Sequence, residues 1–445
     1  MRIVNGFKEA RTLLERQRVT ADCPVSSELK QKLMGMFDTE DPQQAVRQIT
    51  EDVQIQGDDA LFEYTLKIDG VKLNCLEVSR QQVDEALKQV DSRLMAALKL
   101  AADRIYAFHQ KQNEGVLAGV QRMGFGTLMR PLERVGIYAP GGTASYPSTV
   151  LMTAIPAKIA GVSQVYLVTP PGKDGKVPVA TLAAAAIARI ERIFCIGGAQ
   201  AIAALAYGTR TVPRVDKICG PGNIFVMLAK KLVYGAVDID GLQGPSEVVI
   251  IADETADPAN CAAEILAQVE HDSLTSAILI TDSYELASRV DQEVEKQLVV
   301  MERREIAEGA LKNGGIIAVV PDIEKAIELS NMYAPEHLCM DIKGAEAYVD
   351  KIKNAGCVFI GDEPTVVMGD YVAGPSHALP TGGTARFSSP LNVTDFIKYI
   401  NIVNVDKRSL RELGQAAITI ARAEGLEAHA RAVERRLAKN KHIGN

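Results

Sequence analysis

Four of the six histidines stand in short polar motifs, next to side chains that bind metals or move protons. Carboxylate, amide and imidazole groups together suit zinc or a similar divalent ion. A glutamate beside a histidine suits proton transfer near neutral pH. Because histidine is scarce, these segments are the first candidates for a functional site. They are Q-V-E-H (268–271), A-P-E-H-L (334–338), G-D-Y-V-A-G-P-S-H (369–377) and E-G-L-E-A-H (424–429).

The first motif offers a metal-ligating pair. Gln268 and His271 are three residues apart on a predicted helix, a spacing that puts both side chains on one helix face. A Gln amide oxygen and a His nitrogen could open a metal site, although Gln is an uncommon zinc ligand. The competing interpretation is a solvated helix face.

The second motif offers a catalytic pair. Glu336 and His337 follow Pro335, which stiffens the approach to a predicted strand. Consecutive strand residues should point to opposite faces unless the start of the strand is irregular. One side chain could activate water while the other takes a hydroxyl proton. A polar pair at a strand edge is the alternative.

The third and fourth motifs are weaker in isolation. Asp370 and His377 lie in a stretch rich in Gly and Pro, which favours an ordered loop that could carry ligands. A turn-capping Asp and a surface His are the alternative. Glu424 and His429 lie in the tail, where exposed helix residues are the competing interpretation. His109 and His442 have no motif neighbours, and no role is assigned to them.

The elements that must hold these residues follow an alternating pattern from Arg134 onward, because short β-rich runs alternate with Ala-rich helical stretches. This βαβ alternation implies parallel sheets covered by helices. The first series has strands at 134–139, 164–169, 192–197 and 217–220, with helices near 148–160, 177–190 and 199–207. The second has strands at 247–252, 277–281, 315–320, 338–342 and 357–361, with helices near 258–269, 283–301, 323–330 and 345–352.

Two separate series suggest two doubly wound domains, with a boundary near Gly241–Ser246. Residues 1–127 look mainly helical, and 407–439 predict a charged helix pair broken by Gly425. Three glycine-containing runs each follow a strand of the first series, at the carboxyl ends where nucleotides usually bind. No G-x-G-x-x-G is present, so their spacing supports only a ligand at the sheet edge. The runs are 138–142, 197–200 and 220–223.

Composition narrows the function class. The chain has 445 residues and a net charge of −7 without a Lys/Arg-rich run, so we expect a small-molecule substrate and no nucleic-acid partner. Seven scattered cysteines, with no C-x-x-C, indicate a reducing compartment. The N-terminus has no apolar signal region, and no apolar run approaches the ~20 residues of a membrane span. We therefore expect a cytoplasmic protein that does not contact a membrane.

Taken together, the motifs resemble the histidinol dehydrogenase family, in order and from about Arg134 to the tail. The matching segments are V-G-I-Y-A-P-G-G-T-A-S-Y-P-S (135–148), I-G-G-A-Q-A-I-A-A-L-A-Y-G-T (196–209), C-G-P-G-N (219–223), G-P-S-E-V (244–248), Q-V-E-H (268–271), Y-A-P-E-H-L (333–338), G-D-Y-V-A-G-P-S-H-A-L-P-T-G-G-T-A-R-F-S-S-P (369–390) and E-G-L-E-A-H (424–429).

The resemblance assigns a role to each motif residue. It implies one zinc per subunit, held by Gln268, His271, Asp370 and His429, with His429 coming from the partner subunit of a homodimer. It implies that Glu336 and His337 are the catalytic pair. Tyr138, Gln200 and Asn223 match the residues that hold NAD. The substrate contacts would be Ser246, His377 and Glu424, together with the zinc ligands and the catalytic pair.

The resemblance also implies the architecture: an α/β fold of two incomplete Rossmann-like doubly wound domains, a helical N-terminal segment and a small swapped helical tail. On that basis 1–127 is the helical segment, divided between the domains. Residues 128–243 form the NAD-side domain, and 244–385 the zinc and catalytic domain. Residues 386–445 form the tail that contributes to the partner's site.

The implied chemistry is a four-electron oxidation of L-histidinol to L-histidine through L-histidinal, with two NAD, as the last two steps of histidine biosynthesis. The substrate's imidazole and amino groups would chelate zinc, which acts mainly as a template for orientation. His337 would take the hydroxyl proton as hydride leaves. Glu336 would then activate the water that hydrates the aldehyde.

Two departures from the family pattern bear on the substrate. Ser376 stands where many relatives have Asn, and Leu242-Gln243 precede Gly-Pro-Ser where relatives often have small or apolar residues. Related zinc and NAD enzymes oxidise sulfonated diols, but no added Arg or Lys appears in the motifs, and Glu424 suits a cationic substrate. A zinc hydrolase and a non-catalytic metal-binding protein are the remaining alternatives. A hydrolase needs no dinucleotide, so NAD binding would discriminate it, and a non-catalytic protein predicts loss of the Glu–His pair, which is present.

Overall fold

The computed structural model describes residues 1–15, 27–122, 126–141 and 145–441. Positions 142–144 of the family-matching segment 135–148, together with Cys23 and His442, lie outside the described residues. The chain forms two compact units. The first unit comprises residues 1–115 and 131–397, and the second comprises 116–130 and 398–445. All the site residues predicted between 138 and 377 belong to the first unit.

The first sheet has five parallel strands in the order β5-β4-β3-β6-β7. They are β3 (Arg134–Tyr138), β4 (Gln164–Thr169), β5 (Arg192–Cys195), β6 (Lys217–Cys219) and β7 (Asp238–Ile239). Apolar side chains alternate between two cores: Val165 and Leu167 of β4 pack on one face, and Tyr166 and Val168 on the other. A strand that is buried on both faces in this way belongs to a sheet covered by helices on both sides.

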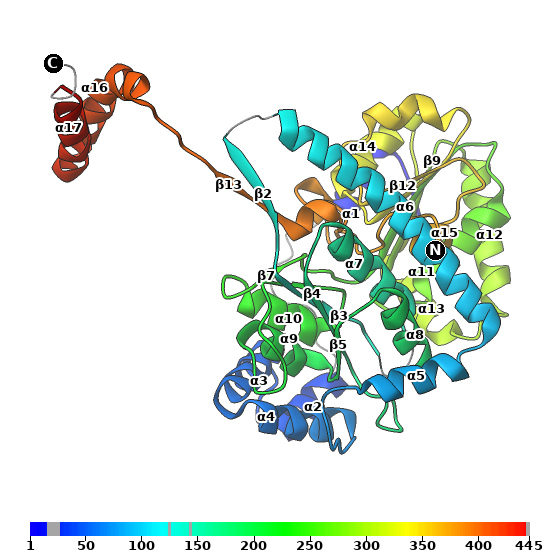
Figure 1. Ribbon diagram of the computed structural model, residues 1–445. Coiled ribbons are helices and arrows are strands. Elements are labelled where there is room, and N and C mark those ends of the chain that lie inside the picture. Colours follow the sequence, from blue (N-terminus) through cyan, green and yellow to red (C-terminus); the bar gives the residue numbers. More distant parts are fainter. Residues whose placement is uncertain (16–26, 123–125, 142–144, 442–445) are drawn as a thin grey trace. The chain divides into compact units, whose positions relative to one another are not determined.

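Helices from distant parts of the sequence cover the two faces of this sheet (Figure 1). On one face lie α3 (Pro42–Gln56), α4 (Asp58–Tyr64), α9 (Gly198–Tyr207) and α10 (Ile224–Val233). On the other lie α5 (Arg80–Gln89), part of α6 (Ser92–Arg122), α7 (Pro147–Ile159) and α8 (Val179–Ile187). The helix α2 (Ser27–Phe37) contacts α3.

The second sheet has six parallel strands in the order β1-β10-β9-β8-β11-β12. They are β1 (Arg2–Asn5), β8 (Glu247–Ala252), β9 (Ser276–Thr281), β10 (Gly315–Val319), β11 (His337–Asp341) and β12 (Cys357–Ile360). One face packs on α11 (Pro258–Val269), α12 (Tyr284–Leu298) and α13 (Arg304–Gly314). The other packs on α1 (Phe7–Leu14), α14 (Ile323–Tyr333) and the 3-10 helix η2 (Ala345–Lys351).

The expected α/β class with parallel sheets is confirmed, and β8 and α11 coincide with their predicted ranges. The structure differs from the sequence pattern at several points. The first residues form β1, a strand within a segment expected to be mainly helical. A separate helix, α13, follows α12. His271 lies just beyond the end of α11, in a turn where its N–H contacts the carbonyl oxygen of Gln268 at 3.3 Å, rather than on the helix.

The helical N-terminal segment is tied to the first sheet by Asp58, whose side chain is buried. It accepts hydrogen bonds from Thr209 Oγ1 at 2.5 Å, from Thr211 Oγ1 at 2.6 Å and from the Thr211 N–H at 3.2 Å. The Arg210 guanidinium lies 3.3 Å away. Burial acts to raise the pKa of this carboxyl, but these partners bring the pKa below its ordinary value. This carboxylate is therefore fully compensated.

The second unit contains a helix pair, α16 (Lys407–Ala423) and α17 (Glu427–Lys441), and most of a two-stranded ladder of β2 (Thr127–Pro131) and β13 (Ile397–Asn401). The helices approach closely at Gly414, where an added Cβ would lie 3.0 Å from Leu437. Gly425, with φ of 74°, makes the turn between them. In the part of the chain that the structure describes, no helix combines the length and apolarity needed to span a bilayer.

Candidate active site

Glu336 and His337 meet at the backbone of one residue, Glu247, the first residue of β8. The Glu247 N–H donates to Glu336 Oε2 at 2.8 Å, and the Glu247 carbonyl oxygen lies 3.1 Å from His337 Nδ1. His337 Nδ1 is 3.6 Å from Glu336 Oε2. The two side chains converge because β11 begins at His337, whereas Glu336 belongs to the turn after Ala334, which has a left-handed backbone (φ 55°). The strand start is thus irregular.

This contact sets the tautomer of His337. A carbonyl oxygen only accepts, so the Nδ1 that faces it carries a proton. In the neutral ring Nε2 is then the basic nitrogen. That atom is buried without a hydrogen-bond partner among the described residues, and its nearest charged neighbour is Asp370 Oδ1 at 3.5 Å. At 3.5 Å the two atoms are too far apart for a good hydrogen bond, so in the neutral ring the Nε2 lone pair is available to accept a proton.

Burial and neighbouring charges shift both pKa values at this pair. Burial raises the pKa of Glu336 to about 7, against the opposing effect of His337. For His337, burial acts to lower the pKa, but the carboxylates of Glu336 and Asp370 outweigh it and raise the pKa to about 9. A buried carboxyl that titrates near neutrality is suited to exchanging protons with substrate or water.

Asp370 and His377 are held together by a backbone contact. Asp370 lies on α15 (Val366–Tyr371), and its carbonyl oxygen is 2.9 Å from His377 Nδ1. His377 Nε2 in turn lies 3.3 Å from Thr149 Oγ1, in the first turn of α7. Burial acts to raise the pKa of Asp370, but His337, His377 and His271 bring it below its ordinary value. All three imidazoles are therefore within electrostatic reach of this carboxylate.

Three of the four predicted metal ligands lie in this unit. Gln268 is 3% exposed, at the end of α11. His271 is exposed just after it. Among the described residues no cluster of three or more His, Cys, Asp or Glu side chains is arranged to hold a metal ion. Of the predicted ligands in this unit, only His271 and Asp370 are of those residue types.

Glu424 and His429 lie in the second unit, at the end of α16 and in α17. Both are exposed in the single chain. Neither side chain serves the packing of the helix pair, whose interior is made by residues such as Ile418 and Ala430. A carboxylate and an imidazole that could bind substrate or metal therefore lie on the surface of this unit.

The residues predicted to hold NAD lie at the carboxyl edge of the first sheet. Tyr138 ends β3, and its hydroxyl accepts a hydrogen bond from the Gly198 N–H at 3.2 Å. Gln200 is fully buried in α9, and neither its amide oxygen nor its amide nitrogen has a partner among the described residues. Asn223 caps α10, because its Oδ1 accepts from the N–H groups of Phe225 and Val226. Buried amides normally have hydrogen-bond partners, so the Gln200 amide leaves hydrogen bonds at this edge unmade.

The loop before Asn223 is held against β3 by a glycine and a buried ion pair. Gly220 has φ of 117°, and an added Cβ would lie 2.0 Å from the Tyr138 carbonyl oxygen, so only glycine fits. Lys230 is 1% exposed and forms an ion pair with Asp240. Its Nζ also donates to the Gly220 carbonyl oxygen at 3.1 Å and to Gln243 Oε1 at 2.9 Å. Gln243 thus accepts a hydrogen bond from the α10 lysine that also holds this loop.

Ser376 has a structural partner as well. Pro156 lies inside α7 and has no N–H, so it leaves the carbonyl oxygen of Met152 without its helical hydrogen bond. The Ser376 hydroxyl donates to that oxygen at 3.1 Å. The two departures from the family pattern, Gln243 and Ser376, therefore bond to protein groups. Neither change requires a different substrate.

Ser246 directly precedes Glu247, whose peptide groups hold the catalytic pair, so its side chain lies at the same amino edge of the second sheet. The sequence analysis missed Glu247 itself and also Glu264. Glu264 Oε2 accepts from the Val366 N–H at 3.1 Å, at the start of the helix that carries Asp370. Its spacing of four residues before Gln268 on one helix face is the signal that could have found it.

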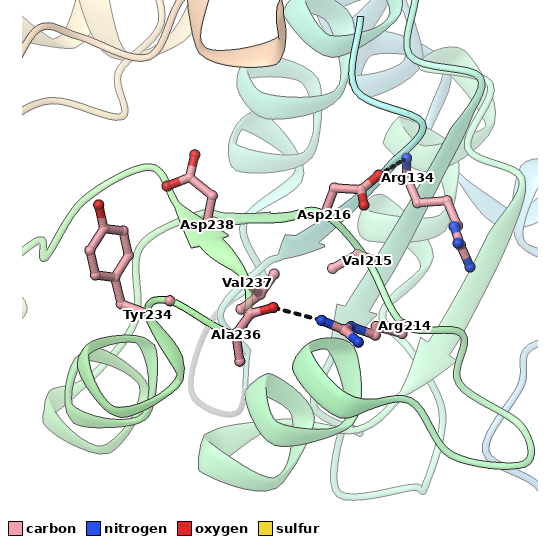
Figure 2. Close-up of a pocket in the computed structure, with 9 residues that line it drawn as sticks. Arg134, Arg214, Val215, Asp216, Tyr234, Ala236, Val237 and Asp238 are labelled. Atoms are coloured by element: carbon pink, nitrogen blue, oxygen red, sulfur yellow. Dashed lines mark hydrogen bonds between the residues drawn. The ribbon is translucent and has the colours of Figure 1, made fainter. Parts of the chain in front are cut away.

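Two cavities lie away from these residues. The larger, of about 590 Å³, opens at the amino edge of the first sheet and is lined by Arg134, Arg214, Asp216, Tyr234 and Asp238, among others (Figure 2). Its polar groups are partly paired, since the Arg134 N–H donates to Asp216 and Arg214 donates to the Ala236 carbonyl oxygen. A second cavity, of about 380 Å³, lies between residues 239–243 and 378–389. Neither contains a predicted site residue.

Comparisons with known proteins agree along the whole chain. A family model described as histidinol dehydrogenase matches residues 34–437. A histidinol dehydrogenase of Dehalococcoides mccartyi (strain CBDB1) is 56% identical over 440 residues, covering 98% of this chain and 100% of that protein. One from Bacillus subtilis (strain 168) is 48% identical over 400 residues, covering 89% and 94%. The crystal structure of histidinol dehydrogenase from Elizabethkingia anophelis has a TM-score of 0.88 and 36% identity, and covers 99% of both chains.

The contact between Ser376 and Met152 generates a stability prediction. We expect Ser376→Ala to lower the free energy of unfolding by about 1–3 kcal/mol, because a buried carbonyl oxygen loses its donor. In a Pro156→Ala background the same change should cost less, since residue 156 regains an N–H for Met152. Urea unfolding of the four variants of this double-mutant cycle measures the difference. An equal cost in both backgrounds would show that the serine stabilises the fold through another contact. One such contact is the hydrogen bond that its hydroxyl oxygen accepts from the Ala378 N–H.

Proposed function

Because this chain belongs to the histidinol dehydrogenase family and is therefore an oxidoreductase, we propose that it oxidises L-histidinol to L-histidine through L-histidinal with two NAD. These are the last two steps of histidine biosynthesis. The observation that carries the proposal is the buried Glu336–His337 pair, which is fixed on the peptide groups of Glu247 beside Asp370. The relatives reported above are all named histidinol dehydrogenase, which does not favour a sulfonated diol as the substrate.

His337 is the base for the alcohol. Its Nδ1 proton is engaged by the Glu247 carbonyl oxygen, so Nε2 is the atom that receives the hydroxyl proton as hydride leaves the carbon. Glu336 then acts on the aldehyde stage. Its carboxylate takes a proton from the water that adds to the carbonyl carbon, while the Glu247 N–H keeps Oε2 in place. The same pair can therefore serve both oxidations without moving.

Zinc would be held by Gln268, His271 and Asp370 together with His429 of the partner subunit. The donor set suits it: an amide oxygen, two imidazoles and a carboxylate, with Gln268 3% exposed and the pKa of the Asp370 carboxyl lowered so that it stays ionised. When bound, zinc supplies an anchor for the imidazole and amino groups of the substrate and so orients the alcohol carbon. Ser246, His377 and Glu424 complete the substrate contacts, along with the ligands and the catalytic pair.

NAD would be held at the carboxyl edge of the first sheet by Tyr138, Gln200 and Asn223. The unpartnered amide of Gln200 supports this, and the Tyr138 hydroxyl, which accepts from the Gly198 N–H, can still donate. When bound, NAD accepts one hydride in each oxidation. The N-termini of α9 and α10 lie at the same edge and favour its phosphates.

Two incomplete Rossmann-like domains and a swapped tail would organise this site. The two sheets share a strand order: in each, the third, second, first, fourth and fifth strands of a series lie side by side, and β1 is added at the edge of the second sheet. We take residues 386–445 as the segment that reaches the partner in a homodimer, which explains the exposed Glu424 and His429. The reducing, cytoplasmic location and the divisions at 127, 243 and 385 stay predictions.

The substrate and metal assignment is tested by NADH formation. We expect NADH from histidinol but not from sulfopropanediol, and we expect a chelator to abolish it. His271→Ala should lose bound zinc and activity together, whereas Asp272→Asn, an exposed neighbour, should keep both. Absorbance at the NADH band and metal analysis of the purified protein give the two readouts. NADH from the diol alone would contradict the proposed substrate.

Glu336 is expected to matter more for the oxidation of the aldehyde than for that of the alcohol. We expect Glu336→Gln to slow the oxidation of supplied histidinal by about 10²–10⁴-fold, and that of histidinol to the aldehyde far less, because only the former needs an activated water. Single-turnover measurements with each substrate distinguish the steps. The exposed Glu254→Gln is the control. Equal losses in both steps would mean that Glu336 serves the alcohol as well.

Shared sites between subunits are tested by mixing. His429→Ala and His337→Ala subunits should each be inactive alone, because the first lacks a zinc ligand and the second lacks the base. After unfolding and refolding together, they should form heterodimers in which one of the two sites is intact. We therefore expect partial recovery of NADH formation. No recovery, with heterodimers detected by mass, would contradict the swapped tail.

A further inference from the structure

Asp69 is a half-buried carboxylate, and the fold leaves its one buried oxygen without a partner. It ends the π-helical turn η1 (Thr65–Asp69), and Gly70 follows in the left-handed region with φ of 70°. Its Oδ2 is buried and has no hydrogen-bond partner among the described residues. Burial raises the pKa of this carboxyl to about 6, so it is ionised at neutral pH at a cost in desolvation. Asp58, from the same N-terminal segment, has four partners and shows the opposite shift.

The position of Asp69 is at the carboxyl edge of the first sheet. After burial, its charge contributes to raising the pKa of the Cys195 thiol, at the end of β5, to about 12. It also raises the pKa of the Tyr138 hydroxyl, at the end of β3, although burial is the larger cause. Two residues on, Val71 lies against Gly175 in the loop after β4, 3.3 Å from where a Cβ would stand. Asp69 therefore faces the ends of β3, β4 and β5.

Unpartnered polar atoms gather at this edge. Besides Asp69 Oδ2, the Thr169 hydroxyl at the end of β4 and both amide atoms of Gln200 are buried without a partner among the described residues. A native interior normally satisfies such groups, so a cluster of them indicates a ligand that supplies the missing partners. The ligand must offer hydrogen-bond donors to Asp69, because a carboxylate only accepts.

The negative charge of Asp69 determines which part of a dinucleotide it can bind. The helix N-termini at this edge favour the phosphates, which a carboxylate repels. The ribose hydroxyls of the adenosine half are neutral donors, and in dinucleotide-binding sheets an acidic residue after the second strand binds them. Here the second strand of the series, β4, ends at Thr169 and is followed by Pro170, Pro171 and Gly172. The first carboxylate after it, Asp174, is exposed and accepts a hydrogen bond from the Lys176 N–H of its own loop at 3.2 Å.

We propose that Asp69, supplied by the N-terminal helical segment, accepts hydrogen bonds from the adenosine ribose hydroxyls of NAD and selects against a dinucleotide with a 2′-phosphate. This inference rests on the proposed use of NAD and adds to it a residue that no motif contains. Asp69 is a binding and specificity residue, and it has no part in the proton transfers of Glu336 and His337.

The test measures binding rather than turnover. Isothermal titration of the zinc-loaded dimer gives Kd for NAD and for NADP, in wild type, Asp69→Asn, Asp69→Ala and the exposed control Asp59→Asn. We expect Asp69→Asn to weaken NAD binding roughly ten- to hundredfold, because the hydrogen bonds lose their charged acceptor. NADP binding should stay level or tighten, since a repulsion is removed. The control should match wild type in both.

Thermal unfolding without dinucleotide separates a binding role from a folding role. Asp69→Asn should keep or raise the unfolding midpoint, because a buried unpaired charge becomes neutral. Unchanged Kd values for both dinucleotides in Asp69→Asn, with wild type binding NAD, would overturn this inference alone. Wild type that binds no NAD would overturn the proposed function with it. If Asp69→Ala fails to fold, the NAD-to-NADP ratio of Asp69→Asn still decides the matter.

Discussion

The proposed chemistry depends on the two peptide groups of Glu247. Its N–H holds Glu336 and its carbonyl oxygen holds His337. Peptide groups at the start of an interior strand are rigid, since β8 is paired with β9 on one side and β11 on the other. The orientation of the carboxylate and the tautomer of the imidazole are therefore set by the sheet. No additional side chain has to orient the base, in contrast to sites where a carboxylate does so.

The helix ends at the two sheet edges carry opposite partial charges. The catalytic pair lies at the amino edge of the second sheet, where α11 and α14 end, and helix C-termini carry partial negative charge. The first sheet presents its carboxyl edge, where α9 and α10 begin with partial positive charge. One edge suits a cation and the other suits phosphate. The Asp370–His377 loop contacts α7 of the first sheet through Thr149, and so connects the two edges.

Much of the fold was predictable because strands buried on both faces make continuous apolar runs, and β8 and α11 were placed to the residue. The parts that were not predictable depend on backbone partners that no pattern displays. His271 leaves the helix because α11 ends two residues earlier. Glu336 and His337 converge because both bond to the peptide of Glu247. Ser376 donates to the Met152 carbonyl oxygen, which lacks its helical hydrogen bond because Pro156 has no N–H. Asp69 has no motif neighbours, and its unpaired oxygen is visible only in three dimensions.

The edge strand β1 has a consequence for folding during translation. Arg2 pairs with Ile316 and Asn5 with Val319, so the partner strand leaves the ribosome more than three hundred residues after β1. At about 5–20 residues per second, the nascent strand waits tens of seconds before β10 arrives. The first sheet, whose strands lie within 134–239, can close during that interval. Strand β1 is thus incorporated long after its synthesis, and until then its apolar residues are candidates for chaperone binding.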